Sequence, residues 1–151
     1  MRFSVEVSPA LEQALRDNAD RCHSIMLAGL SHIGSELADA ARELAGGTGA
    51  YARSMRSAPN GESVVAGSVS PMASLIERGR KPGTAPPARS IQKRSGGSYA
   101  AAQRAAARIG EQGTRGQWTI KKAGKRIAND GTIDRIVSET LRAMGSLGGG
   151  G

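Results

Sequence analysis

The chain has 151 residues, the length of one domain, and its 3% aromatic residues and 21 glycines leave a core of Leu, Ile, Val, Met and Ala. Its net charge is +8, with a pI near 10.6, which favours an anionic partner such as nucleic acid. No apolar run is long enough to span a membrane and no signal-peptide hydrophobic region is present, so we expect a soluble intracellular protein without a membrane partner.

The N-terminal third predicts a strand followed by a long helix. Phe3, Val5 and Val7 alternate with polar residues, which is typical of a half-buried strand. Ser8 and Pro9 then have the character of an N-cap and a first helical residue. We expect this helix to run to about residue 45, where two glycines follow.

An apolar stripe follows one side of this predicted helix. Its spacing alternates between four and seven residues, which keeps it on one side for about ten turns. Gly29 and Gly34 lie inside the helix, where glycine costs about 1 kcal/mol relative to alanine, so we expect another backbone to approach closely there. The stripe consists of Leu11, Leu15, Cys22, Met26, Ile33, Leu37 and Leu44.

A hairpin and a proline-rich segment are predicted next. Residues 51–57 and 62–69 alternate like strands, and Pro59, Asn60 and Gly61 between them are typical turn residues. Ser70 and Pro71 favour one or two helical turns that end at Gly79. Residues 78–87 contain three prolines and predict an open, basic loop, and we expect residues 79–97 to be mobile in the free subunit.

The C-terminal half is predicted to be helical. Residues 88–94 form a short helix, and residues 98–109 form an alanine-rich one capped by Ser98, with Ala101, Ala105 and Ile109 on one face. Residues 110–116 interrupt the pattern, and helices over 118–128 and 132–144 follow. A single domain over residues 1–147 is expected, with a disordered glycine tail at 148–151.

Charge is strongly segregated along the sequence. Residues 1–46 carry four basic and seven acidic residues, whereas residues 78–126 carry thirteen basic residues and one acid, Glu111. A basic face or arm is therefore expected. It could contact nucleic acid or an acidic protein, or it could simply be a solvated surface.

Candidate catalytic residues are few. Cys22 and His23 are neighbours on the predicted helix and therefore point about 100° apart, so the pair is a weak nucleophile candidate. His23 and His32 are nine residues apart, which does not place them on one face as metal ligands. The single cysteine cannot form an internal disulfide, which agrees with a reducing compartment. We expect neither an enzyme nor a cofactor.

Several segments resemble one known family. Residues 48–55 look like the "TG-x-L-x-x-S-I" entry to a hairpin, and residues 69–79 resemble a "Tyr-Ala-x-x-Val-Glu-x-Gly" segment. Residues 80–87 are similar to the proline-rich loop that follows it, and residues 101–113 match a later helix more loosely. These are segments of the tail-completion (neck, or minor head-tail joining) proteins of long-tailed bacteriophages.

The resemblance implies an α+β fold, with a long N-terminal helix packed on a small antiparallel sheet, a proline-rich loop and C-terminal helices. It implies a structural virion protein, assembled in the host cytoplasm, that forms a ring, commonly a hexamer, at the head-proximal end of the tail. Its expected partners are copies of itself, the neighbouring connector, stopper and tail-terminator proteins, and packaged DNA. Head–tail joining and passage of DNA would be its roles.

Two sets of contact residues are expected if the chain is a ring-forming neck protein. Subunit or partner contacts are expected at Met72, Leu75, Ile76, Glu77, Arg78, Arg80, Lys81, Pro82, Pro86 and Pro87. Contacts with DNA or with an acidic partner are expected at Arg89, Lys93, Arg94, Arg104, Arg108, Lys121, Lys122, Lys125 and Arg126.

The alternative is a small nucleic-acid-binding module that uses the loop from Arg78 to Lys81 as an arm. Base readout needs side chains presented from an ordered element, whereas a ring lumen needs only positive charge.

Overall fold

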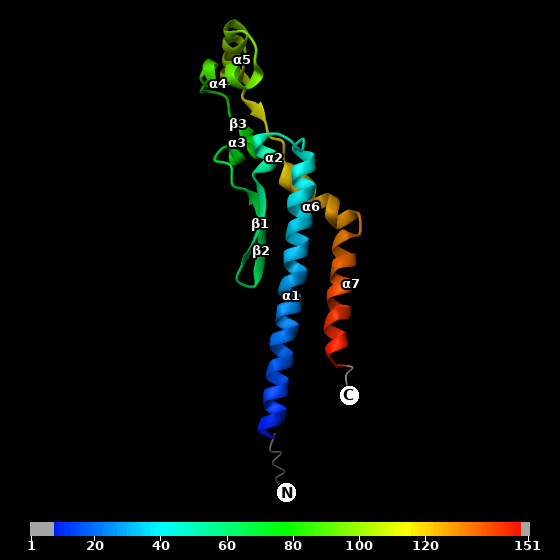
Figure 1. The fold of residues 1–151 in the computed structure, drawn as a ribbon. Helices are drawn as coiled ribbons and strands as arrows, with labels where there is room; N and C mark the ends of the chain where they lie inside the picture. The colour runs from blue at the N-terminus through cyan, green and yellow to red at the C-terminus, as the bar shows by residue number, and fades with distance from the viewer. Residues whose placement is uncertain (1–7, 149–151) are drawn as a thin grey trace.

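A computed structural model describes residues 8–148. The predicted strand at residues 2–7 and residues 149–151 of the predicted glycine tail lie outside this part of the chain, whereas Gly148, which was also expected in the disordered tail, ends a short 3-10 helix. The fold is α+β, as expected: a long helix lies beside a small antiparallel hairpin, and further helices follow (Figure 1). The elements are α1 (Pro9–Leu44), α2 (Ala50–Arg53), β1 (Met55–Asn60), β2 (Ser63–Ser68), α3 (Ala73–Arg78), β3 (Gly79–Arg80), α4 (Ala88–Ser95), α5 (Tyr99–Gln112), β4 (Thr114–Arg115), α6 (Thr119–Asn129), α7 (Thr132–Gly145) and η1 (Ser146–Gly148).

Helix α1 has the predicted bounds. The Ser8 hydroxyl accepts a hydrogen bond from the Leu11 amide at 3.3 Å, Pro9 occupies the first turn, and Gly46 and Gly47 follow the C-cap with positive φ. At 1.5 Å per residue its 36 residues span about 54 Å. Its first turns extend beyond the rest of the molecule (Figure 1). Residues 9–21 are exposed throughout.

The hairpin differs from the prediction at both ends. Residues 51–53 were expected in a strand but form α2, whose helical turn is closed by the Arg53 amide donating to the Gly49 carbonyl at 3.0 Å. Strand β1 continues through Pro59, and Asn60 pairs with Ser63, so the turn is Gly61-Glu62. Gly61 has a φ of 60°, which glycine adopts without strain, whereas proline is tolerated in a strand with an open edge.

Glycines of α1 receive side chains from two other elements. A Cβ on Gly34 would lie 2.3 Å from Val64 Cγ1 of β2, and one on Gly29 would lie 2.4 Å from Thr140 Oγ1 of α7. The predicted close approach is therefore present, but the neighbours are β-branched side chains and not a backbone. Val65, on the opposite face of β2, is exposed.

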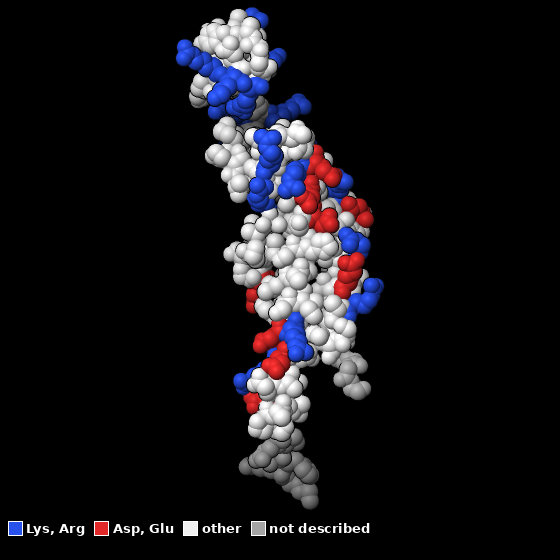
Figure 2. All heavy atoms as spheres, viewed as in Figure 1, with Lys and Arg blue, Asp and Glu red and all other residues white. Residues whose placement is uncertain are grey.

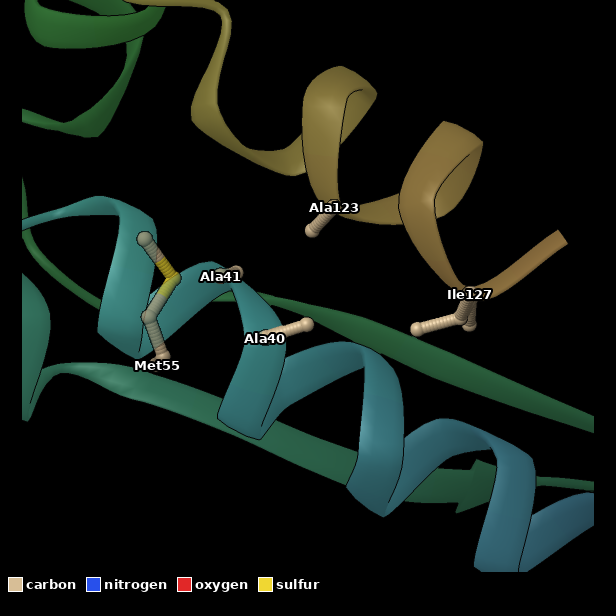
Figure 3. Close-up of a cluster of buried hydrophobic side chains, with 5 residues drawn as sticks. All are labelled: Ala40, Ala41, Met55, Ala123 and Ile127. Atoms are coloured by element: carbon tan, nitrogen blue, oxygen red, sulfur yellow. The ribbon is translucent and has the colours of Figure 1, made fainter. Parts of the chain in front are cut away.

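The core is thin and rich in alanine. Ala40 and Ala41 of α1 pack with Met55 of β1 and with Ala123 and Ile127 of α6 (Figure 3). Large side chains such as Ile33, Leu37 and Ile120 are only partly buried around this cluster. Small side chains let α1 and α6 approach closely, but they bury little apolar area per residue.

The C-terminal helices match the prediction with small shifts. Helix α5 is capped by Ser98, whose hydroxyl accepts from the Ala101 amide at 3.2 Å, and it continues through Gly110, where a break was expected. Its buried residues are Ala102 and Ala106, so the predicted face centred on Ala101 and Ala105 was displaced by one residue. Helices α6 and α7 both pack on α1.

The predicted open loop at residues 78–87 is partly ordered by a partner that the sequence pattern does not indicate. Gly79 and Arg80 pair antiparallel with Arg115 and Thr114, and the Gly83 amide donates to the Gly110 carbonyl at 2.8 Å. The two segments approach so closely that a Cβ on Gly79 would lie 2.1 Å from the Thr114 carbonyl oxygen. The mobility predicted for residues 79–97 stays a prediction.

Candidate interaction surfaces

An apolar groove of about 480 Å³ lies where α3, α4 and α5 meet the β3–β4 pair. Its apolar side chains come from segments far apart in the sequence, and we refer to them together as the groove floor. The floor is made of Met72, Leu75, Ile76, Pro86, Ile91 and Ile109. Met72 remains exposed, and the other five are half-buried. Such a surface can hold apolar groups of a ligand or partner.

Three arginines line the groove together with this floor. Arg80 comes from β3, Arg94 from α4 and Arg115 from β4. Arg80 Nη1 donates to the Thr84 carbonyl at 3.3 Å, but none of the three forms an ion pair with a residue in 8–148. We call these three residues the arginine rim. Helices α4 and α5 lie at the end of the molecule over which Lys and Arg side chains gather (Figures 1 and 2).

A half-buried polar network holds the base of the groove to α6. Glu77, the residue after Ile76 on α3, accepts hydrogen bonds from the amides of Thr119 at 3.0 Å and Ile120 at 3.3 Å, and also from the Tyr51 hydroxyl. Burial, followed by the hydrogen bond to Glu77 and its negative charge, raises the pKa of Tyr51 above its ordinary value. Glu77 was predicted to contact a partner, but its carboxylate accepts these hydrogen bonds from its own chain.

A second apolar surface runs along α1 and α7. Leu11, Leu15, Cys22 and Met26 follow one side of α1, and Met26 then joins Leu30, Ile33, Val137 and Leu141 around a groove of about 170 Å³. Leu15 is 59% exposed and Leu141 is 62% exposed. We call Leu11, Leu15, Cys22, Met26, Val137 and Leu141 the α1–α7 stripe. The part of the predicted helix stripe that is packed in the core is limited to Ile33 and Leu37.

The predicted contact residues divide between several places. Met72, Leu75, Ile76, Arg80, Pro86 and Arg94 line the groove, whereas Arg78, Lys81, Pro82 and Pro87 are exposed beside it without lining it. Arg89 and Lys93 are exposed on α4, and Arg104 and Arg108 are exposed on α5. Lys121, Lys122, Lys125 and Arg126 are exposed on α6.

The basic residues between positions 78 and 126, which were expected to form one face or arm, therefore form two groups. One group covers the α4–α5 end, and the other lies on the outer face of α6. Two members of the α6 group have neighbours in their own chain: Lys121 Nζ lies 5.8 Å from the centre of the Trp118 ring, and Arg126 Nη1 lies 2.9 Å from Glu43 Oε2. Figure 2 shows acidic side chains among the basic ones in the middle of the molecule, where α6 lies.

Sequence reasoning missed half of the groove. Ile91, Ser95, Ile109, Thr114, Arg115 and Gln117 line it but were not predicted as contact residues. Ile91 and Ile109 could have been found, because each is the one large aliphatic residue of its helix and therefore marks the helix face that packs. Arg115 could not, since a two-residue strand has no periodicity to detect.

No arrangement of side chains in residues 8–148 suggests a metal centre. No group of three or more His, Cys, Asp or Glu side chains is close enough to hold an ion there. Cys22 is half-buried on the α1–α7 stripe, and His23 is exposed. Within the same part of the chain, no helix combines the length and apolarity that crossing a bilayer requires.

No protein-family model matches the chain, no curated protein is significantly similar to it in sequence, and no solved structure is significantly similar to it in fold.

Proposed function

We propose that this protein is a structural subunit of the neck of a long-tailed phage virion, where it forms a closed homo-oligomeric ring at the head-proximal end of the tail. In this role it takes part in head–tail joining and in the passage of DNA. Connector, stopper and tail-terminator proteins are its proposed neighbours, and it has no enzymatic activity or cofactor. The family resemblance of residues 48–55 and 69–87 motivates the choice of phage neck.

The observation that carries the assembly part of this proposal is the amount of exposed surface. The chain exposes 10,891 Å². A compact monomer of 15.6 kDa is expected to expose about 7,200 Å², from the scaling of surface with mass. A thin alanine core and an excess of this size are typical of subunits that bury much of their surface only on assembly.

The α1–α7 stripe is the surface that we assign to the subunit contact. Leu11 and Leu15 are more than half exposed on a helix end that no other element within residues 8–148 covers, and Leu141 continues the apolar surface on α7. Leucines left this exposed are a liability for a monomer, whereas in a ring they would pack against the next copy.

Native mass spectrometry and light scattering of the purified chain test this contact. The wild-type chain should form one closed oligomer, and Leu15→Asp or Leu141→Asp should shift it to a monomer that keeps its helical circular dichroism. Because both side chains are exposed, folding of the subunit should survive the change. Val65→Asp is the matched control, since Val65 is 56% exposed on the hairpin face outside the stripe. A wild-type chain that stays monomeric at all concentrations would contradict the assembly proposal.

The phage assignment needs a separate test. Mass spectrometry of purified virions should detect this chain, and loss of its gene should yield full heads and tails that remain unjoined. Joined, infective particles without the chain would exclude the neck role while leaving self-association untouched.

A second candidate function is sequence-independent nucleic-acid binding by the monomer. The observation in its favour is the gathering of Lys and Arg over the α4–α5 end, where Glu111 is the one acid of α4 and α5 (Figure 2). A gel shift with random duplex and the monomeric Leu15→Asp variant separates the two functions. Tight binding by that monomer favours the nucleic-acid module, and weak binding favours the ring subunit.

A further inference from the structure

We infer that the groove between α3, α4, α5 and the β3–β4 pair is a docking site for an acidic, amphipathic segment of another protein. The segment would place apolar side chains on the groove floor and carboxylates against the arginine rim. This inference rests on the proposed function, because it gives one neighbour of the ring subunit a binding site and a chemistry.

The groove floor provides the apolar part of the recognition. Ile91 of α4 and Ile109 of α5 face the same groove as Leu75 and Ile76 of α3, so one occupant touches three helices. The volume of about 480 Å³ falls in the range of about 300–1,000 Å³ that binding pockets have. Apolar side chains placed here would leave water, as they do when an amphipathic segment enters a hydrophobic groove.

The arginine rim determines the charge of the occupant. Arg80, Arg94 and Arg115 line the groove together with the floor, and among residues 8–148 no acidic side chain lines it with them. The guanidinium group is suited to this task because its fork of donors matches a carboxylate with two parallel hydrogen bonds. A segment in which aspartate or glutamate flanks the apolar residues therefore complements both parts of the site.

Two other occupants fit less well. Duplex DNA offers phosphates for the rim, but its sugar–phosphate surface has nothing comparable to place on six apolar side chains. In the proposed ring a second copy of this chain packs on the α1–α7 stripe, which leaves the groove open to a different protein. An acidic segment of a different protein satisfies the floor and the rim together.

A yeast-displayed library of random peptides, selected against the purified full chain, tests the inference without assuming a sequence. Enriched peptides should combine Asp or Glu with Leu, Ile or Phe. A synthetic, fluorescent copy of an enriched peptide should bind more weakly as salt rises. The double variant Arg94→Glu with Arg115→Glu should reduce its affinity by about tenfold or more, because like charges then face each other.

Two matched controls separate the site from general charge and hydrophobicity. Arg16→Glu with Arg21→Glu makes an equal double charge reversal on α1 outside the groove, and it should leave peptide affinity unchanged. Met72→Asp alters the floor at an exposed position and should weaken binding, whereas Val69→Asp, which is 73% exposed nearby and does not line the groove, should not. Circular dichroism verifies the fold of each variant.

The remaining outcomes would overturn the inference. Failure to enrich peptides, enrichment without acidic residues, or equal binding to the Arg94→Glu, Arg115→Glu variant would each do so. Polyglutamate that binds as well as the peptide would reduce the site to charge alone, and competition by random duplex would assign it to nucleic acid. Loss of the oligomer in the groove variant would assign it to a second copy. Failure of the ring proposal can be told apart from failure of this inference. The ring is tested by the oligomeric state of the wild-type chain and of the α1–α7 stripe variants, and a monomeric wild-type chain would still bind the peptide.

Discussion

Glu77 supplies the cap that α6 lacks in its own sequence, because its Oε1 accepts the Thr119 amide at 3.0 Å across 42 positions of the chain. The residue before α6 is Trp118, which has a left-handed φ of 52° and no side chain that can cap a helix. A carboxylate at this end also interacts favourably with the helix dipole. One residue of α3 thereby fixes the position of a helix whose core side chains pack on α1.

Replacing Glu77 should therefore destabilise the whole chain and not only its α3 turn. Glu77→Ala leaves the Thr119 and Ile120 amides and the Tyr51 hydroxyl without their acceptor. We expect a loss of about 2–3 kcal/mol in the free energy of unfolding, from the cost of an uncapped helix and an unsatisfied hydroxyl. Urea unfolding followed by circular dichroism measures it. Glu77→Gln keeps one acceptor oxygen and should lose less, and a stable Glu77→Ala would contradict the cap.

Replacing Gly34, against which the Val64 side chain packs, should destabilise the chain. In Gly34→Ala the new Cβ would meet Val64 Cγ1 at 2.3 Å, so the gain in helix propensity of about 1 kcal/mol should be outweighed by a packing cost of about 1–3 kcal/mol. Adding Val64→Ala should remove most of that packing cost. Gly124→Ala in α6 is the matched control, because its nearest neighbour is Leu37 Cδ1 at 4.0 Å, and it should stabilise the chain. Thermal unfolding measures the stability of each variant. Equal stability of Gly34→Ala and Gly124→Ala would contradict the prediction.

Alkaline pH should weaken the contact between Tyr51 and Glu77. Because the pKa of Tyr51 is raised in the folded chain, the unfolded chain loses this proton first as the pH rises above about 10. The folded state then binds more protons than the unfolded state, so stability falls with pH in this range, whereas below it this group gives no slope. Unfolding free energies measured across this range should fall more steeply for wild type than for Tyr51→Phe. Tyr99→Phe is the matched substitution, and equal slopes for wild type and Tyr51→Phe would refute the prediction.

The α6 cations should act through charge alone. Lys121→Glu with Lys122→Glu reverses two exposed charges on α6, and we expect weaker binding of the assembled protein to random duplex for every sequence alike. Each DNA phosphate that the variant no longer neutralises should lower the slope of log affinity against log salt by about 0.9. Arg16→Glu with Arg21→Glu changes the net charge equally on α1 and should leave this slope unchanged. Head–tail joining measured on the same α6 variant shows whether these lysines instead meet an acidic protein. Wild-type values in both assays would make the α6 charge a solvated surface.

Most of the helices and strands could be predicted from local sequence patterns. Local signals were sufficient for α1, for α7 and for the start of α5, since Ser8 and Ser98 are side-chain caps and Gly46 and Gly131 adopt a positive φ at helix ends. The segregation of charge along the chain and the scarcity of large aromatic core residues could likewise be predicted from the sequence. These features depend on neighbours within one or two helical turns, so a linear pattern contains them.

The surfaces that those elements share depend on long-range packing. The β3–β4 pair joins residues that lie 34 and 36 positions apart, and its close approach depends on Gly79, Gly113 and Gly116, which as isolated glycines predict only turns or flexibility. Glu77 was expected to face a partner, but contacts across 42 and 43 positions turned it inward. The arginine rim combines Arg80, Arg94 and Arg115 in the same way. Long-range pairing has no period in the sequence, because the chain is brought together there by the geometry of packing and not by its local conformational preference.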